Sequence, residues 1–242
     1  MENRWDISKA LDTKSPSPTI VSPIDGAEMV LVPQGPITMG ITEAELQQIF
    51  LMDQRENPIF ATEAPTRTIY LDSYYIDRYP VTNYQYRKFV QETGHREPSL
   101  WNHPSWGQPM QPVVFVGGDD ARAYAKWAGK SLPTEAQWEK AGRGTERYWW
   151  SWGHEFLPDR CNSREYGLGR TSEIGLFDKG ISPYGAMICV VMYGRCARVN
   201  GLVSICQCGG DASWALRHSL GSPVAGPLRI PLMVLIGLGF AA

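Results

Sequence analysis

Cysteine and histidine are the residue types best able to hold a metal or exchange electrons in this chain. There are five cysteines and four histidines in 242 residues. Cys206 and Cys208 are separated by one residue, whereas common zinc and redox sites use C-x₂-C. The histidines show no H-x₃-H spacing. The sequence therefore predicts no histidine metal site and no functional pair at Cys206 and Cys208. Cys161, the only cysteine before residue 186, is interpreted as a structural thiol.

Two carboxylates have a spacing that would suit acid–base chemistry. Glu135 and Glu139 are four residues apart, so a helix would place them on one face. The alternative for Glu135 is that the helix dipole favours an acidic residue in the first turn. Arg143, Arg147 and Arg160 are interpreted as solvated or paired structural cations.

The composition predicts a loop-rich domain with aromatic anchors. Nine Trp, 11 Tyr, 24 Gly and 18 Pro accompany only 20% charged residues, a balance that favours irregular segments held by aromatic side chains. A net charge of −2 gives no electrostatic reason to expect nucleic acid or an anionic membrane as a partner. We expect a monomer with a small-molecule or protein ligand. Five tryptophans are interpreted as core or loop anchors: Trp127, Trp138, Trp149, Trp150 and Trp152.

The two ends of the chain differ from its middle. Residues 1–25 contain a Ser/Pro cluster and are predicted to form a disordered leader. Residues 1–19 are charged without an apolar run, so we predict no secretory signal and a cytoplasmic location. Residues 230–240 are apolar, but about 11 residues are too few to cross a bilayer, which needs roughly 20.

Helix signals recur between residues 26 and 185, the predicted domain. A Thr followed three residues later by Glu or Gln predicts a capped helix start at Thr42, Thr82 and Thr134. The second helix is predicted to run to about Thr93, before Gly94. A fourth helix is predicted at 120–128, capped by Asp119 or Asp120 and ended by Gly129.

Strand signals complete the predicted domain. β-branched and aromatic residues between turn signals predict short strands at 28–32, 67–71 and 74–77. The helical spacing also predicts burial of four aromatic side chains: Tyr86, Phe89, Trp127 and Trp138.

Several stretches, taken in order, resemble the formylglycine-generating enzyme (sulfatase-modifying factor) family. The most specific runs from Trp127-Ala128-Gly129-Lys130 through Leu132-Pro133-Thr134-Glu135-Ala136-Gln137-Trp138-Glu139. The resemblance implies an α+β, C-type-lectin-like fold with short strands, few helices and much ordered loop. The other matching stretches are 29–33 with 39–40, 63–65 leading into 79–83, 111–114 and 182–185.

Residues 186–242 do not continue the family pattern and form an atypical tail. They hold one of the 25 acidic residues and four of the five cysteines. If each codon is read from its third base, Met187–Ile188 forces Asp and Met192–Tyr193 forces Val. The neighbouring junctions then permit Tyr-Asp-Met-Cys-Gly-Asn-Val-Trp-Glu, the family's expected continuation. We therefore interpret the tail as an out-of-frame translation, which leaves the C-terminal portion of the fold incomplete; a divergent tail is the alternative.

The resemblance also implies cofactors. Active members use two C-terminal cysteines to hold copper and to exchange with a substrate cysteine, and that motif is absent as written. We therefore expect a family member without oxidase activity. Asn162 matches the position at which relatives use an Asn to bind structural calcium, an ion that takes oxygen ligands.

Two other functions are alternatives to the copper oxidase. A non-catalytic module binding a protein or small molecule through its loops is the main alternative. A sulfoxide synthase ranks last, because those relatives bind iron through an additional helical domain with a histidine cluster.

Overall fold

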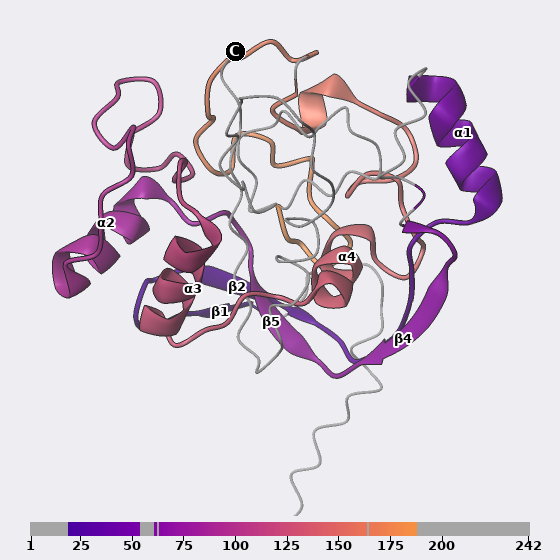
Figure 1. The fold of residues 1–242 in the computed structure, drawn as a ribbon, viewed down its shortest axis with the longest axis horizontal. Helices are drawn as coiled ribbons and strands as arrows, with labels where there is room; N and C mark the ends of the chain where they lie inside the picture. Colours follow the sequence, from indigo (N-terminus) through magenta and orange to yellow (C-terminus); the bar gives the residue numbers. More distant parts are fainter. Residues whose placement is uncertain (1–18, 54–60, 62, 164, 188–242) are drawn as a thin grey trace, which may run out of the picture.

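The computed structural model describes residues 19–53, 61, 63–163 and 165–187, which form the predicted α+β fold. Helices α2 and α3 lie at one end of the molecule and α1 at the other, with α4 between them (Figure 1). The elements are β1 (Thr19–Val21), β2 (Glu28–Val32), β3 (Gly35–Met39), α1 (Glu43–Asp53), β4 (Arg67–Leu71), β5 (Tyr74–Asp77), α2 (Asn83–Thr93), α3 (Gly118–Trp127), α4 (Glu135–Arg143) and the short 3₁₀ turn η3 (Pro158–Arg160).

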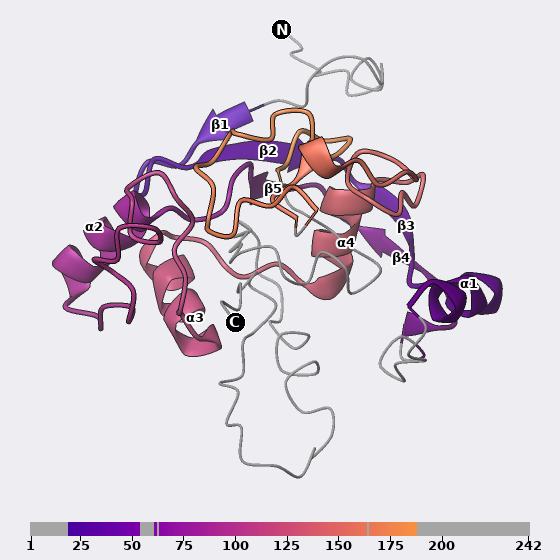
Figure 2. The same cartoon turned by 90° about the horizontal axis from the view of Figure 1, so that it is seen from above.

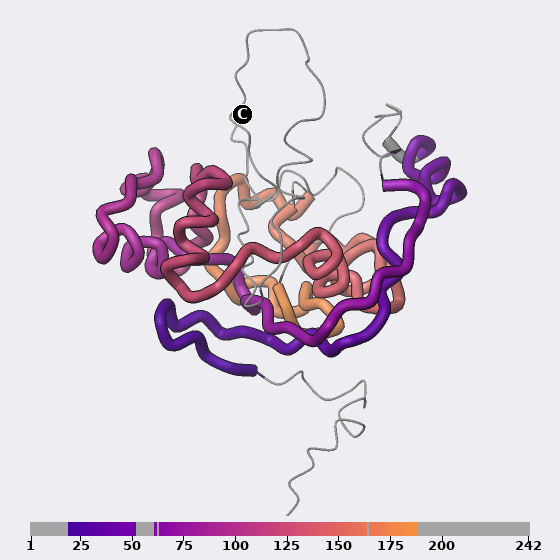
Figure 3. Tube along the Cα trace, turned by 60° about the horizontal axis from the view of Figure 1, so that its bottom comes forward, coloured from indigo at the N-terminus to yellow at the C-terminus, as the bar shows by residue number. Residues whose placement is uncertain are grey.

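Strand β2 is central in an antiparallel sheet ordered β1-β2-β5, and β3 pairs with β4 in a second, two-stranded sheet. Two residues connect β2 to β3 (33–34) and two connect β4 to β5 (72–73). The two ladders are therefore one long hairpin interrupted at these connections. The strand limits predicted at 28–32, 67–71 and 74–77 are confirmed. In Figure 3 the N-terminal strands run along one side of the molecule, with the helices on the other.

A buried lysine closes the interruption between β2 and β3. The Lys140 ammonium donates to the carbonyl oxygens of Pro33, at 2.7 Å, and Gly35, at 3.0 Å. Burial lowers the pKa of Lys140. These contacts give the buried ammonium two hydrogen-bond acceptors at the connection between β2 and β3, and they attach α4 to the hairpin.

The three predicted capping boxes are confirmed at Thr42, Thr82 and Thr134. Each threonine hydroxyl accepts from the backbone N–H three residues on, and that residue's side chain accepts from the threonine N–H. Helix α2 ends as predicted at Gly94, whose φ of 69° is left-handed. Among the described helices, none has both the length and the apolar character needed to cross a membrane.

The start of α3 differs from the prediction. Its N-cap is Gly117 rather than Asp119 or Asp120. The Asp120 carboxylate accepts from the Gly117 N–H at 2.6 Å, so it caps the helix from its third position. Asp120 was therefore correctly named as a capping side chain, but the prediction placed it at the helix boundary, where Gly117 has no side chain.

The predicted aromatic core is confirmed at Tyr86 and Phe89, which are both 2% exposed. Their rings contact each other edge to face, with centroids 5.2 Å apart. Trp127 and Trp138 are only half-buried. The Trp127 indole N–H donates to the Glu92 carboxylate at 2.9 Å on the exposed side of α2, which explains why this ring stays at the edge of the core.

Residues 19–25, expected in the disordered leader, belong to the fold. Strand β1 pairs with β2, with Thr19 opposite Val30, and Asp25 is 6% exposed. The main-chain ladder and the buried carboxylate hold this segment on the domain. Residues 1–18 of the predicted leader and residues 188–242 of the predicted tail lie outside the described residues.

Asp25, Asp77 and Lys130 form a buried ion cluster. The Lys130 ammonium lies 2.8 Å from a carboxylate oxygen of each aspartate, and all three side chains are at most 1% exposed. Burial raises the pKa of Asp77 to about 7, against the attraction of Lys130. Burial acts to raise the pKa of Asp25 too, but Lys130 and the Tyr124 hydroxyl, which donates at 2.8 Å, hold it below its ordinary value. The cluster joins the β1–β2 turn, β5 and the segment after α3.

Candidate functional site

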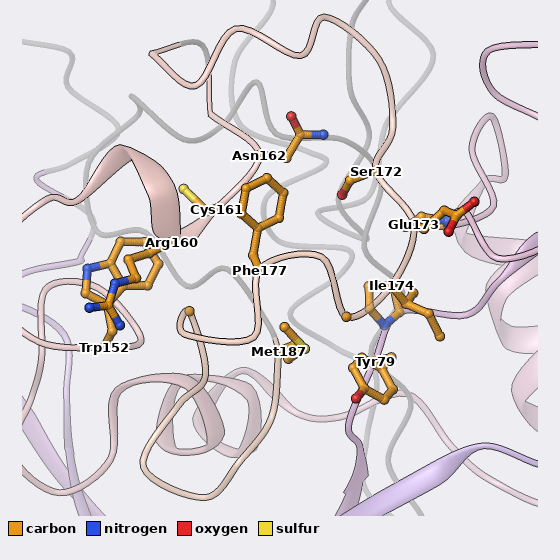
Figure 4. Close-up of a pocket in the computed structure, with 14 residues that line it drawn as sticks. Tyr79, Trp152, Arg160, Cys161, Asn162, Ser172, Glu173, Ile174, Phe177 and Met187 are labelled. Atoms are coloured by element: carbon orange, nitrogen blue, oxygen red, sulfur yellow. The ribbon is translucent and has the colours of Figure 1, made fainter.

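A cavity of about 70 Å³ lies where several distant stretches of the chain meet (Figure 4). Its wall is mostly apolar and aromatic, with Arg160 as the one lining cation and Glu173 as the one lining anion. An apolar wall with a few polar groups is usual for a small-molecule site, but pockets for drug-sized ligands are roughly 300–1,000 Å³, so this cavity suits only a small ligand. The lining residues are Tyr79, Pro80, Pro112, Trp152, Arg160, Cys161, Asn162, Ser172, Glu173, Ile174, Gly175, Phe177, Gly180 and Met187.

A tight turn positions the tryptophan in the wall. Trp150 and Gly153 exchange both backbone hydrogen bonds, at 2.9 and 3.1 Å. Gly153 has a φ of 144°, which disfavours a residue with a side chain. The Trp150 ring stacks on Trp152 at 5.7 Å and contacts Phe156 at 4.8 Å. The packed ring of Trp150 thus supports the Trp152 side chain beside the cavity.

The segment carrying Arg160 is held by a close backbone contact. A Cβ on Gly180 would lie 1.8 Å from the Arg160 carbonyl oxygen, so the two segments approach this closely only with glycine there. Arg160 Nη1 donates to the Lys179 carbonyl oxygen at 2.8 Å. This contact binds the loop that contains Phe177 to η3, within the irregular region 144–187 that lies near α4 (Figure 2).

The opposite wall is fixed by hydrogen bonds to the loop before α3 and to the segment after β5. The Ile174 N–H donates to the Met110 carbonyl at 3.0 Å. The Gln111 side-chain amide, 1% exposed, donates to the Thr171 carbonyl at 2.9 Å. The Met187 N–H donates to the Arg78 carbonyl at 2.7 Å. Backbone and buried side-chain contacts therefore set the cavity's shape independently of any ligand.

Asn162, the residue matched to a calcium position, lies in the cavity wall and is 8% exposed. Its side-chain N–H donates to the Arg170 carbonyl at 2.8 Å, which leaves its amide oxygen as the atom able to bind an ion. Calcium takes six to eight oxygen ligands. In the described part of the chain no three His, Cys, Asp or Glu side chains gather as metal ligands. Asn162 is thus one ligand that fits, and the described acidic groups do not supply the others.

Cys161 carries a buried thiol that is not part of a disulfide, and it also lines the cavity. It is the only cysteine within the described residues, since Cys189, Cys196, Cys206 and Cys208 lie beyond residue 187. Copper held by two thiolates needs a second cysteine, so the described residues do not fit that cofactor.

The glutamate pair suggested by its spacing is divided between two structural contacts. Glu139 forms an ion pair with buried Arg143 and accepts from the Gly40 N–H at 3.1 Å. Burial raises the pKa of Glu139, against the attraction of Arg143. Glu135 lies 3.9 Å from Arg67 at the surface. Neither glutamate lines the cavity, so α4 uses them for packing rather than as an acid pair.

Sequence reasoning missed most of this cavity. Arg160 had been interpreted as structural and Trp152 as an anchor, and the remaining lining residues, apart from Cys161 and Asn162, were not singled out. The chain carries no local signal for them because Tyr79, Trp152 and Met187 come from stretches far apart in the sequence.

Comparison with known proteins gives a family match over most of the described region. A model described as the sulfatase-modifying factor enzyme 1-like domain matches residues 17–188. The formylglycine-generating enzyme of Bos taurus is 28% identical over 213 residues, covering 68% of this chain and 53% of its own length. A second protein of Bos taurus, inactive C-alpha-formylglycine-generating enzyme 2, is 32% identical over 170 residues, covering 51% and 56%. The chain thus spans about half the length of these curated relatives.

A solved structure supports the fold. The structure of PvdO from Pseudomonas aeruginosa matches with a TM-score of 0.56 and 23% identity, covering 74% of this chain and 72% of that one. The two chains therefore have a similar fold, and at this sequence identity the similarity shows the fold alone.

Proposed function

Since the chain belongs to the sulfatase-modifying factor enzyme 1-like family, we propose that it is a member without oxidase activity that binds a ligand in the cavity beside Cys161 and Asn162. The observation that carries this proposal is the cavity wall, which is aromatic and apolar and contains a single thiol. A fold of this kind supports many functions, so the site decides between them.

The binding part of the proposal rests on how the cavity is built. Gln111 and the turn at Trp150–Gly153 hold opposite walls through hydrogen bonds. A wall that is already ordered loses little conformational freedom when a ligand enters. Irregular loops on a rigid scaffold are also where binding residues concentrate.

The lack of oxidase activity rests on the thiols. Copper chemistry on a substrate cysteine in active relatives needs a pair of cysteines, and the C-terminal motif that carries the pair is not present as written. The family also includes a relative whose name states that it is inactive. A member of the family can therefore keep the fold and lack the oxidase reaction.

The cause that we propose for the missing motif is a shift of reading frame near Gly185. Two forced residues, Asp from Met187–Ile188 and Val from Met192–Tyr193, fall where the family has them. Sequencing the gene tests this directly. If the gene, read from the third base of each codon, does not encode Gly-Asn-Val-Trp-Glu, the proposal is overturned and the tail is a divergent one.

Two assays test the function. Purified protein is incubated with copper and a peptide carrying the sulfatase motif, and the peptide is weighed by mass spectrometry. We expect no change in mass, whereas a decrease matching conversion of the thiol to an aldehyde would contradict the proposal.

The second assay measures binding by ligand-observed NMR with indole and phenylacetamide, two neutral aromatic probes. We expect both to bind the chain and neither to bind Ile174→Trp, in which a larger ring fills the cavity. A matched change outside the cavity, Leu51→Trp, affects an 81% exposed side chain and should leave binding intact. Equal binding to both variants would place the probes elsewhere.

A further inference from the structure

The guanidinium of Arg160 has spare hydrogen-bonding capacity in the cavity wall. Nη1 donates to the Lys179 carbonyl, but Nε is buried and has no hydrogen-bond partner. The nearest carboxylate, Asp159, is 3.7 Å from Nε, which is too long for a hydrogen bond. A buried donor without a partner is costly, so this atom is a place where a ligand acceptor would be favoured.

The neighbouring acid does not neutralise this arginine strongly. The Asp159 side chain is 64% exposed and that of Arg160 is 30% exposed. Water therefore screens the Asp159 charge, and an exposed pair of this kind contributes little. The guanidinium keeps its positive charge and part of its donor set for a group entering the cavity.

The other lining side chains indicate which kind of chemical group carries the anion that Arg160 would bind. Figure 4 shows Arg160 beside Trp152 on one side of the cavity and Glu173 on the other, with Phe177 and Tyr79 among the side chains that face the space between them. An anionic ligand would therefore place its charge at Arg160, away from Glu173, and its apolar part against the rings.

We propose that this cavity binds a small aromatic carboxylate, with its carboxylate on Arg160 and its ring among the apolar side chains. A carboxylate is favoured because its planar pair of oxygens matches the guanidinium fork. A phosphate carries more charge than one lining cation offsets, and Glu173 opposes it. This inference rests on the proposed function, because it assigns a ligand class to the same cavity.

The test compares phenylacetate with an uncharged analogue, phenylacetamide, and with a cationic one, phenethylamine, by isothermal titration calorimetry. We expect phenylacetate to bind at least about tenfold more tightly than phenylacetamide, since a charge-assisted hydrogen bond is roughly twice as strong as a neutral one. Phenethylamine should bind more weakly than phenylacetate. Equal affinities of phenylacetate and phenylacetamide would overturn the role of Arg160 and leave the cavity as a binding site. Absence of binding by all three would overturn the proposed function as well.

Variants locate the charge. Arg160→Gln should reduce phenylacetate affinity at least about tenfold and phenylacetamide affinity by less, because the amide oxygen accepts a weaker, neutral hydrogen bond. Arg122→Gln is the matched control, because Arg122 pairs with Asp119 on α3 and does not line the cavity. Loss of phenylacetate affinity in both variants would indicate a general charge effect and contradict the proposal. If Arg160→Gln does not fold, the preference of the unmodified chain for carboxylate over amide decides alone.

Discussion

The buried ion cluster and the cavity wall both hold charge at least partly away from bulk water, and they differ in how completely that charge is partnered. In the buried ion cluster, Lys130 lies 2.8 Å from both Asp25 and Asp77, and none of the three side chains is more than 1% exposed. In the cavity wall, Arg160 has one carbonyl partner and a buried Nε without any.

The difference separates a charge used for the fold from one available for binding. Charges taken out of water must be paired and hydrogen-bonded, or they destabilise the folded state. The cluster meets that requirement by joining three segments of the chain. Arg160 meets it only in part. Its side chain is 30% exposed to solvent, and its buried Nε has no hydrogen-bond partner. That atom can bind a ligand acceptor.

The largest expected effect follows from removing the centre of the cluster. Lys130→Met leaves the buried carboxylates of Asp25 and Asp77 without their cation, and breaking a buried pair in this way costs about 3–5 kcal/mol. Urea denaturation measures the change. Lys126→Met, at an exposed position of α3, is the control and should stay within about 0.5 kcal/mol.

A triple variant sharpens this prediction. Changing Lys130 to Met together with Asp25 and Asp77 to Asn removes all three charges, and replacement of a whole buried charge set is often close to neutral. The triple variant should therefore be more stable than Lys130→Met alone. If Lys130→Met costs less than its control, the cluster is not important for stability.

The second effect is a dependence of stability on pH. The pKa of Asp77 is raised to about 7 from 3.8 in the folded chain, so between about pH 4 and 7 the folded state holds a proton that the unfolded state has lost. The contribution of Asp77 to stability therefore falls as pH rises through this window, by at most about 1.4 kcal/mol per pH unit.

Asp25 acts in the opposite sense. Its pKa is lowered, so its contribution is present above its ordinary pKa and is lost as pH falls below it. Asp77→Asn should remove the decline in stability between pH 4 and 7. It should keep the loss of stability at lower pH that comes from Asp25. Unfolding in urea at several pH values measures this, and an unchanged slope in Asp77→Asn would contradict the assignment.

The sequence predicted those parts of the fold whose causes are local. Each capping box at Thr42, Thr82 and Thr134 is complete within four residues, so the start of each helix could be read directly. The limits of β2, β4 and β5 were predictable for the same reason, whereas β1 and β3 were not predicted. At the start of α3 the sequence named Asp120 as a possible cap, but its carboxylate caps from the third helical position and Gly117 is the N-cap residue.

The ion cluster and the cavity could not be predicted because their members meet only in the folded chain. Lys130 is 105 residues from Asp25 and 53 from Asp77. The resemblance to a family located Asn162, but no periodicity or spacing indicated that Trp152 and Arg160 share a wall with it. Asp25 was also placed in a leader, because serine and proline nearby outweighed one carboxylate.

The third prediction tests whether calcium binds at Asn162, a neutral residue in the wall of the same cavity. If the ion binds the folded chain alone, calcium at ten times its Kd stabilises by about 1.4 kcal/mol, and a chelator removes that gain. Asn162→Leu should abolish the difference between calcium and chelator, whereas Asn162→Asp keeps a side-chain oxygen and should retain it. Thermal unfolding measures both. No calcium response in the unmodified chain would remove Asn162 as a ligand.

The smallest effect is expected for Arg160 in the absence of ligand. Arg160→Gln loses one hydrogen bond, to the Lys179 carbonyl, and a pairing with Asp159 that solvent screens. We expect a loss of about 1 kcal/mol or less, measured by urea denaturation beside Lys130→Met. Because the guanidinium is incompletely partnered, its removal should matter for carboxylate binding far more than for folding. A destabilisation as large as that of Lys130→Met would mean that Arg160 is a structural cation, and the distinction between the cluster and the cavity wall would then fail.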